Sequence, residues 1–306
     1  MRPKHAAAIS ILLVGCLSGC QSGAPGARFL SLVGLSKKPV VIALTPEPGV
    51  LNPFDPYEQL RRTLEKQLAQ PVRLELAFPF QVEANLELGF YNYALIGLRD
   101  YLVLGKPQRF EVLAVSLDSD GQQARPAVLV VPANSPIERI EELRGKTVAF
   151  GPVEDARSYL AGLALLNEHG IKKTDLSLEL LPVPGSVKHF AKMRDIAQSV
   201  MNFSSDAGFI DVAAYQALPD NSDDRSEPCK RRLRVLARTR PVPDKVLIRS
   251  PKADPQLDAA VREFFLSVGR EHPDAVRAVR LGGFAPPGED FQQLCDYLSA
   301  TRSAGW

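Results

Sequence analysis

From residue 40 onward, short apolar runs alternate with segments of helical periodicity. Val40–Leu44 is a continuous apolar run, and leucines recur four residues apart at Leu60, Leu64 and Leu68. The run predicts a buried strand, and the leucine spacing predicts a helix over Pro56–Leu68. The rest of this first unit is predicted as the strands Val72–Ala77 and Tyr93–Ile96, the helix Gln81–Leu88 between them, and the outgoing strands Phe110–Leu117 and Pro126–Val131. A β-α-β-α-β order indicates an α/β fold with a parallel sheet covered by helices.

A second α/β unit follows, again with alternating predicted strands and helices. The predicted helices are Pro136–Leu143 with Ser135 as cap, Ala156–His169 closed by Gly170, and Val187–Val200; the predicted strands are Thr147–Phe150, Leu178–Leu181 and Ala207–Ile210. Two further strands are expected at Leu233–Ala237 and Val246–Ile248, and two helices at Asp254–Glu271 and Gly288–Ala300. These last helices come too late to complete the second unit, so we expect them to return to the first.

The N-terminus has the pattern of an export signal. A basic start at Arg2 and Lys4 precedes an apolar stretch over Ala6–Val14, and Leu17-Ser-Gly-Cys20 ends it. The apolar stretch is about half the ~20 residues that span a bilayer as a helix, so a signal peptide is favoured over a retained anchor. Leu17-Ser-Gly-Cys20 also resembles the lipobox of bacterial lipoproteins, which implies a lipid-modified Cys20. The alternative is an ordinary signal peptide with an incidental cysteine. We predict a signal peptide over 1–19 and a lipid-anchored tether over 20–38.

Charge and cysteine usage narrow the function classes. The net charge is +2, and Arg2 and Lys4 account for it; the remaining 35 basic and 35 acidic side chains balance. A large basic surface for nucleic acid is therefore not expected. Export places the folded part in an oxidising compartment, where a disulfide between Cys229 and Cys295 and a pair of free thiols are both open options.

One stretch carries a family resemblance. Pro126–Phe150, with Asn134-Ser-Pro-Ile137 and Leu143-Arg-Gly-Lys146, resembles the phosphonate, phosphate and phosphite solute-binding proteins of bacterial ABC importers. Asp206-Ala-Gly-Phe-Ile-Asp211 and the crossing Pro241-Val-Pro243 are similar to the family in order and spacing. The resemblance implies a type II periplasmic binding protein fold, with two α/β lobes, two crossing strands and a ligand cleft. We expect lobe 1 over 39–127 with 241–306, and lobe 2 over 128–240.

The resemblance also points to the residues of the cleft. The positions that match the family's binding segments are Thr45, Phe80, Tyr101, Asp155, Arg157, Ser158, Ser186, Asp211, Thr239 and Arg240. The family's Ser-Thr-Ser run falls on Asp155-Ala-Arg157, so its hydroxyl cradle is missing. Asp155 is open to two interpretations, a helix cap or a ligand residue. Arg157 is open to two as well, a bidentate fork or a solvated side chain.

Signals for other chemistry are weak. Gly145-Lys-Thr147 lacks the first glycine of a P-loop, because Ile140 stands at that position. The histidines share no metal-ligand spacing, and no nucleophile elbow is present. We expect no enzyme activity, no cofactor and no metal.

We predict a monomeric protein in the periplasm, anchored by lipidated Cys20, that passes a small solute (phosphonate, phosphate or a related polar ligand) to an ABC permease. The alternative is a non-transport lipoprotein that keeps the fold for sensing or protein interaction.

Overall fold

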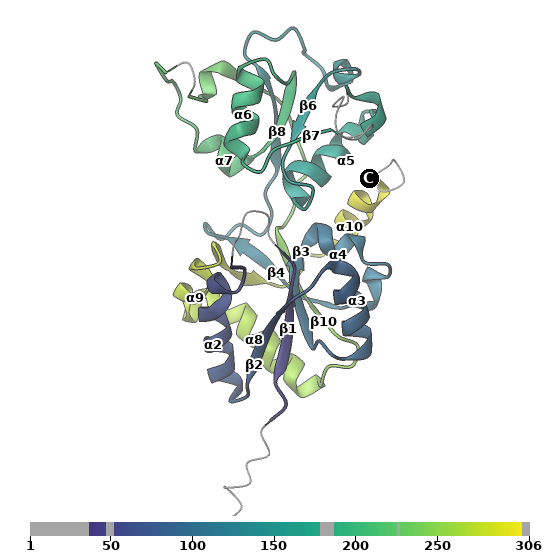
Figure 1. Ribbon diagram of the computed structural model, residues 1–306, viewed down its shortest axis with the longest axis vertical. Coiled ribbons are helices and arrows are strands. Elements are labelled where there is room, and N and C mark those ends of the chain that lie inside the picture. The colour runs from purple at the N-terminus through teal and green to yellow at the C-terminus, as the bar shows by residue number, and fades with distance from the viewer. Residues whose placement is uncertain (1–36, 47–51, 178–186, 225–226, 302–306) are drawn as a thin grey trace, which may run out of the picture. The chain divides into compact units, whose positions relative to one another are not determined.

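A computed structural model describes residues 37–46, 52–177, 187–224 and 227–301. The predicted leader, Cys20 and the strand Leu178–Leu181 lie outside these residues. The described residues from Lys38 onward belong to one compact unit, which is built around two sheets (Figure 1). Below, each sheet with its helices is called a lobe; the predicted domain boundaries themselves stay a prediction.

Lobe 1 has a mixed six-stranded sheet in the order β11-β4-β10-β3-β1-β2. Its strands are β1 (Val40–Leu44), β2 (Val72–Leu76), β3 (Tyr93–Gly97), β4 (Val112–Asp118), β10 (Lys245–Arg249) and β11 (Leu281–Ala285). β1 runs parallel to both β2 and β3, as the β-α-β-α-β order predicts, and β10 adds antiparallel to β3. All five residues of β1 are buried, which explains why this strand reads as an unbroken apolar run.

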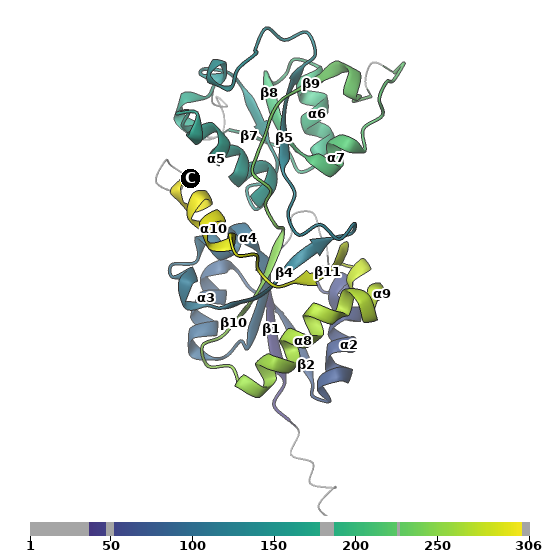
Figure 2. The same ribbon diagram turned by 180° about the vertical axis from the view of Figure 1, so that it is seen from behind.

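Helices cover both faces of this sheet (Figures 1 and 2). On one face, α2 (Glu58–Leu68), α8 (Pro255–Glu271) and α9 (Pro273–Arg277) share a core with β1 and β3. On the other face lie α3 (Pro79–Leu88), α4 (Leu98–Val103) and α10 (Phe291–Ala300). The two late helices α8 and α10 thus return to the first lobe, as expected.

Lobe 2 has a five-stranded sheet in the order β7-β6-β8-β5-β9. Its elements are β5 (Ala127–Pro132), β6 (Val148–Phe150), β7 (Lys188–His189), β8 (Ala207–Asp211), β9 (Leu233–Arg238), α5 (Ala161–Glu168), α6 (Met193–Met201) and α7 (Val212–Gln216). A π-helical turn, Ala156–Leu160, leads into α5. Two cores lie on the two faces of the sheet, one beneath α5 and one beneath α6.

Two segments carry the chain between the sheets, from β4 to β5 and from β9 to β10, and they are bonded to each other. Arg125 and Val242 exchange backbone hydrogen bonds of 3.2 and 2.8 Å. The Thr239 hydroxyl accepts a bond from the Ala127 amide at 2.8 Å and donates one to the Arg240 carbonyl at 3.0 Å. The Thr239 side chain therefore joins the two crossing segments.

One predicted helix is wrong, and another begins later than predicted. Only Ile140–Leu143 of the segment after Ser135 is helical, as one 3₁₀ turn. The Glu142 carboxylate accepts bonds from the amides of Glu138 and Arg139, which satisfies those donors outside a helix. The start of the predicted helix Val187–Val200 instead contains β7, which pairs with the edge of β6; α6 begins only at Met193.

The structure also bears on the cysteine pair, for which the sequence left a disulfide and two free thiols open. Cys229 and Cys295 are both buried, and both are free. Cys229 precedes β9 in lobe 2, whereas Cys295 lies on α10 of lobe 1. The disulfide that the sequence left open is therefore not formed, and the thiols serve as small apolar core groups.

Candidate functional site

A cavity of about 200 Å³ opens where strands of both sheets end at their carboxyl edges. Ligands of open α/β sheets are expected at this edge. Its lining comprises Thr45, Pro46, Gly97, Asp100, Pro152, Glu154, Asp155, Ala191, Asp244 and Lys245. Below, this set is called the cleft cavity. Thr45 follows β1, Gly97 ends β3, Asp155 lies in the loop after β6, and Asp244 directly precedes β10.

Asp155 caps the helix that begins beside the cavity. Its carboxylate accepts bonds from the Arg157 amide at 2.8 Å and the Ser158 amide at 3.4 Å. The Ser158 hydroxyl donates to the same carboxylate at 2.6 Å. Of the two interpretations of Asp155, the structure therefore shows the cap. The donors that a bound anion would use at this helix start are already taken by a carboxylate of the chain.

Burial raises the pKa of Asp155, and the nearby carboxylate of Asp244 adds to this rise. The bonds from Ser158 and Arg157 act in the opposite direction, because they favour the ionised form. Two carboxylates, those of Asp155 and Asp244, therefore lie close to each other at this helix start.

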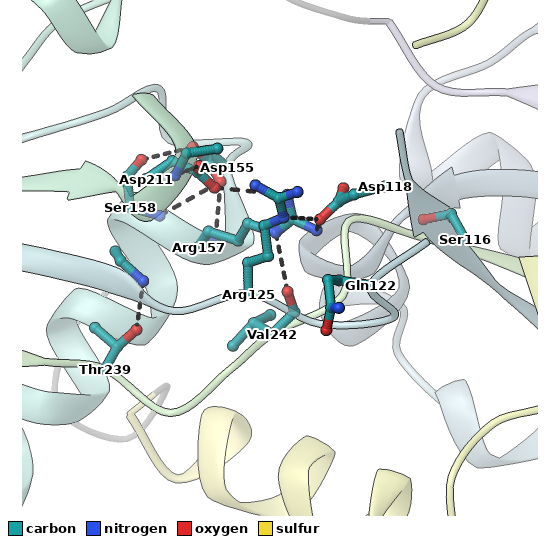
Figure 3. A network of polar contacts seen from close by, with 12 residues as sticks. Ser116, Asp118, Gln122, Arg125, Asp155, Arg157, Ser158, Asp211, Thr239 and Val242 are labelled. Atoms are coloured by element: carbon teal, nitrogen blue, oxygen red, sulfur yellow. Dashed lines mark hydrogen bonds and ion pairs between the residues drawn. The ribbon is translucent and has the colours of Figure 1, made fainter. Parts of the chain in front are cut away.

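Arg157 joins the two lobes (Figure 3). Its Nη2 donates to both carboxylate oxygens of Asp118 at 3.0 Å, and its Nε donates to the Val242 carbonyl at 2.9 Å. Asp118 ends β4 in lobe 1, and Val242 lies in the return crossing. In lobe 2, Arg157 also forms an ion pair with Asp211 at 3.5 Å. The guanidinium is therefore a bridge inside the protein, which is neither of the two roles expected from the sequence.

The bridge continues through Arg125 of the outgoing crossing. Its Nε lies 2.8 Å from Asp118, and its Nη2 pairs with Asp120. Burial raises the pKa of Asp118 even though both arginines lower it. For Arg157, burial opposes the charged form, but the carboxylates of Asp244, Asp118 and Asp211 outweigh it and raise the pKa. The surrounding acids thus reinforce a positive charge that an arginine carries at neutral pH in any case.

Asp100 is the second carboxylate at a helix start facing the cavity. It lies in the first turn of α4, is only 6% exposed, and pairs with Arg99 at 3.5 Å. Burial raises its pKa, while a hydrogen bond with the Thr45 side chain lowers it. Thr45 thus lines the cavity and contacts Asp100, and its role in binding a ligand stays a prediction.

Three further predicted residues, Phe80, Tyr101 and Arg240, lie away from the cavity lining. Phe80 is 72% exposed and stacks on Phe78, with ring centroids 6.3 Å apart. The Tyr101 hydroxyl donates to the Pro107 carbonyl in the core of lobe 1. Arg240 pairs with Glu168 at 2.6 Å and lies 3.8 Å over the Tyr297 ring. Ser186 falls outside the described residues.

Of the predicted set, the cavity lining holds Thr45 and Asp155, and the bridge next to it adds Arg157, Ser158 and Asp211. The sequence did not single out Asp100, Glu154, Asp244 and Lys245, which complete the charged lining. For two of these residues the sequence did hold a signal of a place at the cleft, since Asp100 follows the end of a predicted strand and Asp244 precedes another.

Within the part of the chain that the structure describes, no group of three or more His, Cys, Asp or Glu side chains is arranged to hold a metal ion. The same residues include no helix that is long and apolar enough to cross a membrane.

Comparison with known proteins agrees with this architecture. XAC2383 from Xanthomonas citri, in a structure bound to chloride ion, matches with a TM-score of 0.66 at 20% identity, covering 86% of this chain and 97% of that one. PhnD1 from Prochlorococcus marinus, in complex with methylphosphonate, matches with a TM-score of 0.59 at 14% identity, covering 87% and 98%. A binding protein component of an ABC phosphonate transporter from Pseudomonas aeruginosa, PA3383, matches with a TM-score of 0.58 at 15% identity, covering 88% and 89%.

Two sheets linked by two crossings, with a cavity at their carboxyl edges, define a type II periplasmic binding protein. The family model for the periplasmic substrate-binding protein of phosphonate ABC transporters matches residues 53–290. The chain belongs to this family, which consists of solute-binding proteins rather than enzymes.

Proposed function

We propose that this protein is a lipid-anchored, monomeric solute-binding component of an ABC importer, which closes its two lobes around a small polar solute and delivers it to a permease. The observation that carries the proposal is the cleft cavity, which takes its lining from the carboxyl edges of both sheets. Family membership supports the link to an importer and to the periplasm.

The size of the cavity supports a small solute. The cavity measures about 200 Å³, which is below the roughly 300–1,000 Å³ that is typical of pockets for drug-sized ligands. The contacts between the crossing segments support a hinge at this place, because Arg125, Thr239 and Val242 hold the two passages together. Lobe closure about such a hinge is a common way for two-lobed proteins to enclose a ligand.

Scattering tests the closure. The radius of gyration of the protein is measured with and without each member of a panel of small cationic, neutral and anionic solutes. We expect at least one solute to lower it, and calorimetry with the same solute to show saturable binding. The proposed function would be contradicted if no solute of the panel bound and none changed the radius of gyration.

Membrane anchoring through Cys20 is tested separately. We expect radioactive palmitate to label the full chain and the label to disappear in Cys20→Ala. Cys16→Ala is the matched control, because Cys16 lies within the predicted signal peptide and its loss should leave the label unchanged. Equal labelling of both variants would contradict the lipid anchor.

A second candidate function is sensing or protein interaction without transport. One observation favours it: Asp155 caps the helix start and Asp118 holds Arg157, so groups suited to an anion are used within the chain. This candidate predicts that the lobes keep their spacing with every solute in the panel and that the protein copurifies with a partner other than a permease.

A further inference from the structure

Two large apolar side chains lie exposed at the end of α3. Leu88 is 58% exposed and Phe90 is 66% exposed, and they flank Gly89, whose φ of 80° turns the chain out of the helix. The amides of Gly89 and Phe90 bond to the carbonyls of Leu86 and Asn85 at 3.2 and 2.9 Å. This Schellman arrangement often lets the residue after the glycine pack back on its helix. Here the Phe90 side chain remains mostly exposed, on a turn whose backbone is held in place.

The apolar pair lies at the edge of the lobe 1 sheet where the parallel strands begin. α3 returns the chain from the end of β2 to the start of β3, which adjoins the start of β1. Asn92, two residues after Phe90, is bound to Val41 in both directions. Its side-chain oxygen accepts from the Val41 amide at 2.8 Å, and its amide donates to the Val41 carbonyl at 2.9 Å. The apolar pair therefore lies close to the place where the chain enters the lobe.

Exposed lysines lie along the same edge. Lys38 precedes β1, and its carbonyl accepts a bond from the Gln70 side chain at 2.6 Å. Lys66 lies in the last turn of α2, just before Gln70. Lys252 follows β10 and donates from Nζ to the Leu88 carbonyl at 3.3 Å. We call Leu88, Phe90, Lys38, Lys66 and Lys252 the basal patch.

Acidic side chains near the basal patch are bound within the chain. Glu111 and Asp258 pair with Arg249 at 2.8 and 2.9 Å, and Asp254 caps α8. The carboxylates of Glu65 and Glu87 pair with Arg61 and Arg109. The lysines of the basal patch are therefore available to attract an anion outside the protein.

We propose that the basal patch contacts the surface of a lipid bilayer that carries anionic headgroups. The inference rests on the lipid anchor of the proposed function, because seventeen residues, 21–37, separate Cys20 from Lys38. A chain of that length spans at most roughly 60 Å in any conformation, so an anchor at Cys20 keeps this edge of lobe 1 near the bilayer. Aromatic and aliphatic side chains insert at the boundary between headgroups and acyl chains, and nearby lysines are attracted to anionic lipids.

The composition of the basal patch favours a bilayer over a protein partner. A stable protein interface buries about 1,200–2,000 Å² in total, and two exposed apolar side chains supply little of such an area. A bilayer, in contrast, takes up single side chains. The contact also leaves the cleft cavity accessible, because the cavity lies at the carboxyl ends of β1 and β3 and the basal patch at their amino ends.

Fluorescence quenching by brominated lipids tests this contact. The lipidated protein is reconstituted into vesicles of brominated phosphatidylcholine and phosphatidylglycerol, with Trp306→Phe removing the single tryptophan of the chain. In this background, we expect bromine to lower the fluorescence of Phe90→Trp roughly twofold, because interfacial side chains lie about 5–10 Å into the boundary with the acyl chains. Phe203→Trp is the matched control. Phe203 is 68% exposed on lobe 2, and we expect no quenching there.

Lipid charge tests the lysines. We expect the quenching of Phe90→Trp to fall at least twofold when phosphatidylcholine replaces phosphatidylglycerol, and equally when Lys66→Gln and Lys252→Gln are introduced together. Quenching that is the same with and without anionic lipid overturns the role of the lysines.

Three results overturn the contact itself. These are equal quenching of Phe90→Trp and Phe203→Trp, no quenching of either, and a dimer in solution that Phe90→Gln dissociates, which would assign the apolar pair to a second copy of the chain. Flotation separates these failures from a failure of the anchor. If the protein floats with the vesicles in these cases, the lipid anchor stands without the basal contact. If the protein does not float, the anchor and the inference are refuted together.

Discussion

Replacement of Arg157 by alanine removes the ion pair that links the two lobes. The Arg157 and Asp118 side chains are only 12% and 13% exposed, so water screens their charges poorly. Removal of one partner from a buried ion pair typically costs 3–5 kcal/mol, because the remaining charge stays buried. Asp118 keeps Arg125 at 2.8 Å, so we expect a loss at the lower end, about 3 kcal/mol in the free energy of unfolding.

Urea unfolding at pH 7, followed by circular dichroism, measures this loss. For a chain of this size, about 3 kcal/mol corresponds to a fall in melting temperature of roughly 6–12 °C. Arg277→Ala is the matched control: its ion pair with Asp274 is 76% and 80% exposed, and exposed pairs contribute little to stability. We therefore expect Arg277→Ala to unfold close to the wild type.

A double-mutant cycle separates the pair from other effects. Asp118→Ala and Arg157→Ala should each be strongly destabilising, and the double variant should lose less than the sum of the two, because the unpaired charge is then absent. If Arg157→Ala unfolds at the same urea concentration as Arg277→Ala, or if the two losses simply add, the interpretation of Arg157 as a structural bridge is refuted.

Three further predictions concern the cores. Gly269→Ala should destabilise the protein by roughly 3 kcal/mol in urea unfolding, because the added methyl group would overlap the Gly282 carbonyl. At an exposed helical site the same change stabilises a protein by about 1 kcal/mol, so a gain in the free energy of unfolding would contradict this packing. Cys229 and Cys295 should react with an aromatic disulfide reagent only after unfolding, since both are buried and burial raises the pKa of Cys295 to about 12; rapid reaction of the native protein would be the opposite result. Burial lowers the pKa of His189 below its ordinary value of 6.5, so the folded state binds a proton at this imidazole less readily than the unfolded state does. The free energy of unfolding should therefore fall as the pH drops below 6.5. His189→Gln should flatten this fall between pH 7 and 5, and an identical fall in the variant and the wild type would contradict the prediction.

The order of strands and helices was predictable because it depends on local pattern. The apolar run of β1 and the leucine spacing of α2 are visible in the sequence, and both elements form where they were expected. Short elements were missed: α4 has six residues and α7 has five, which is too few for a helical period to show. In β11, two adjacent glycines hide the strand.

The role of a site residue was predictable only where it depends on neighbouring positions in the sequence. Asp155 precedes a helix and caps it, as its position suggested. Arg240 was assigned to the cleft, but its partner Glu168 lies 72 positions away in sequence and draws it elsewhere. The role of Arg157 likewise depends on Asp118, which is 39 positions away and in the other lobe. Such pairings follow from the packing of the lobes and leave no local pattern.

The proposed function requires the two lobes to close around a solute in the cleft cavity. X-ray scattering of the protein, with and without each solute of the panel, tests this most directly. We expect at least one solute to lower the radius of gyration at the concentration at which calorimetry shows saturable binding. A radius of gyration that stays constant with every solute that binds would contradict the account.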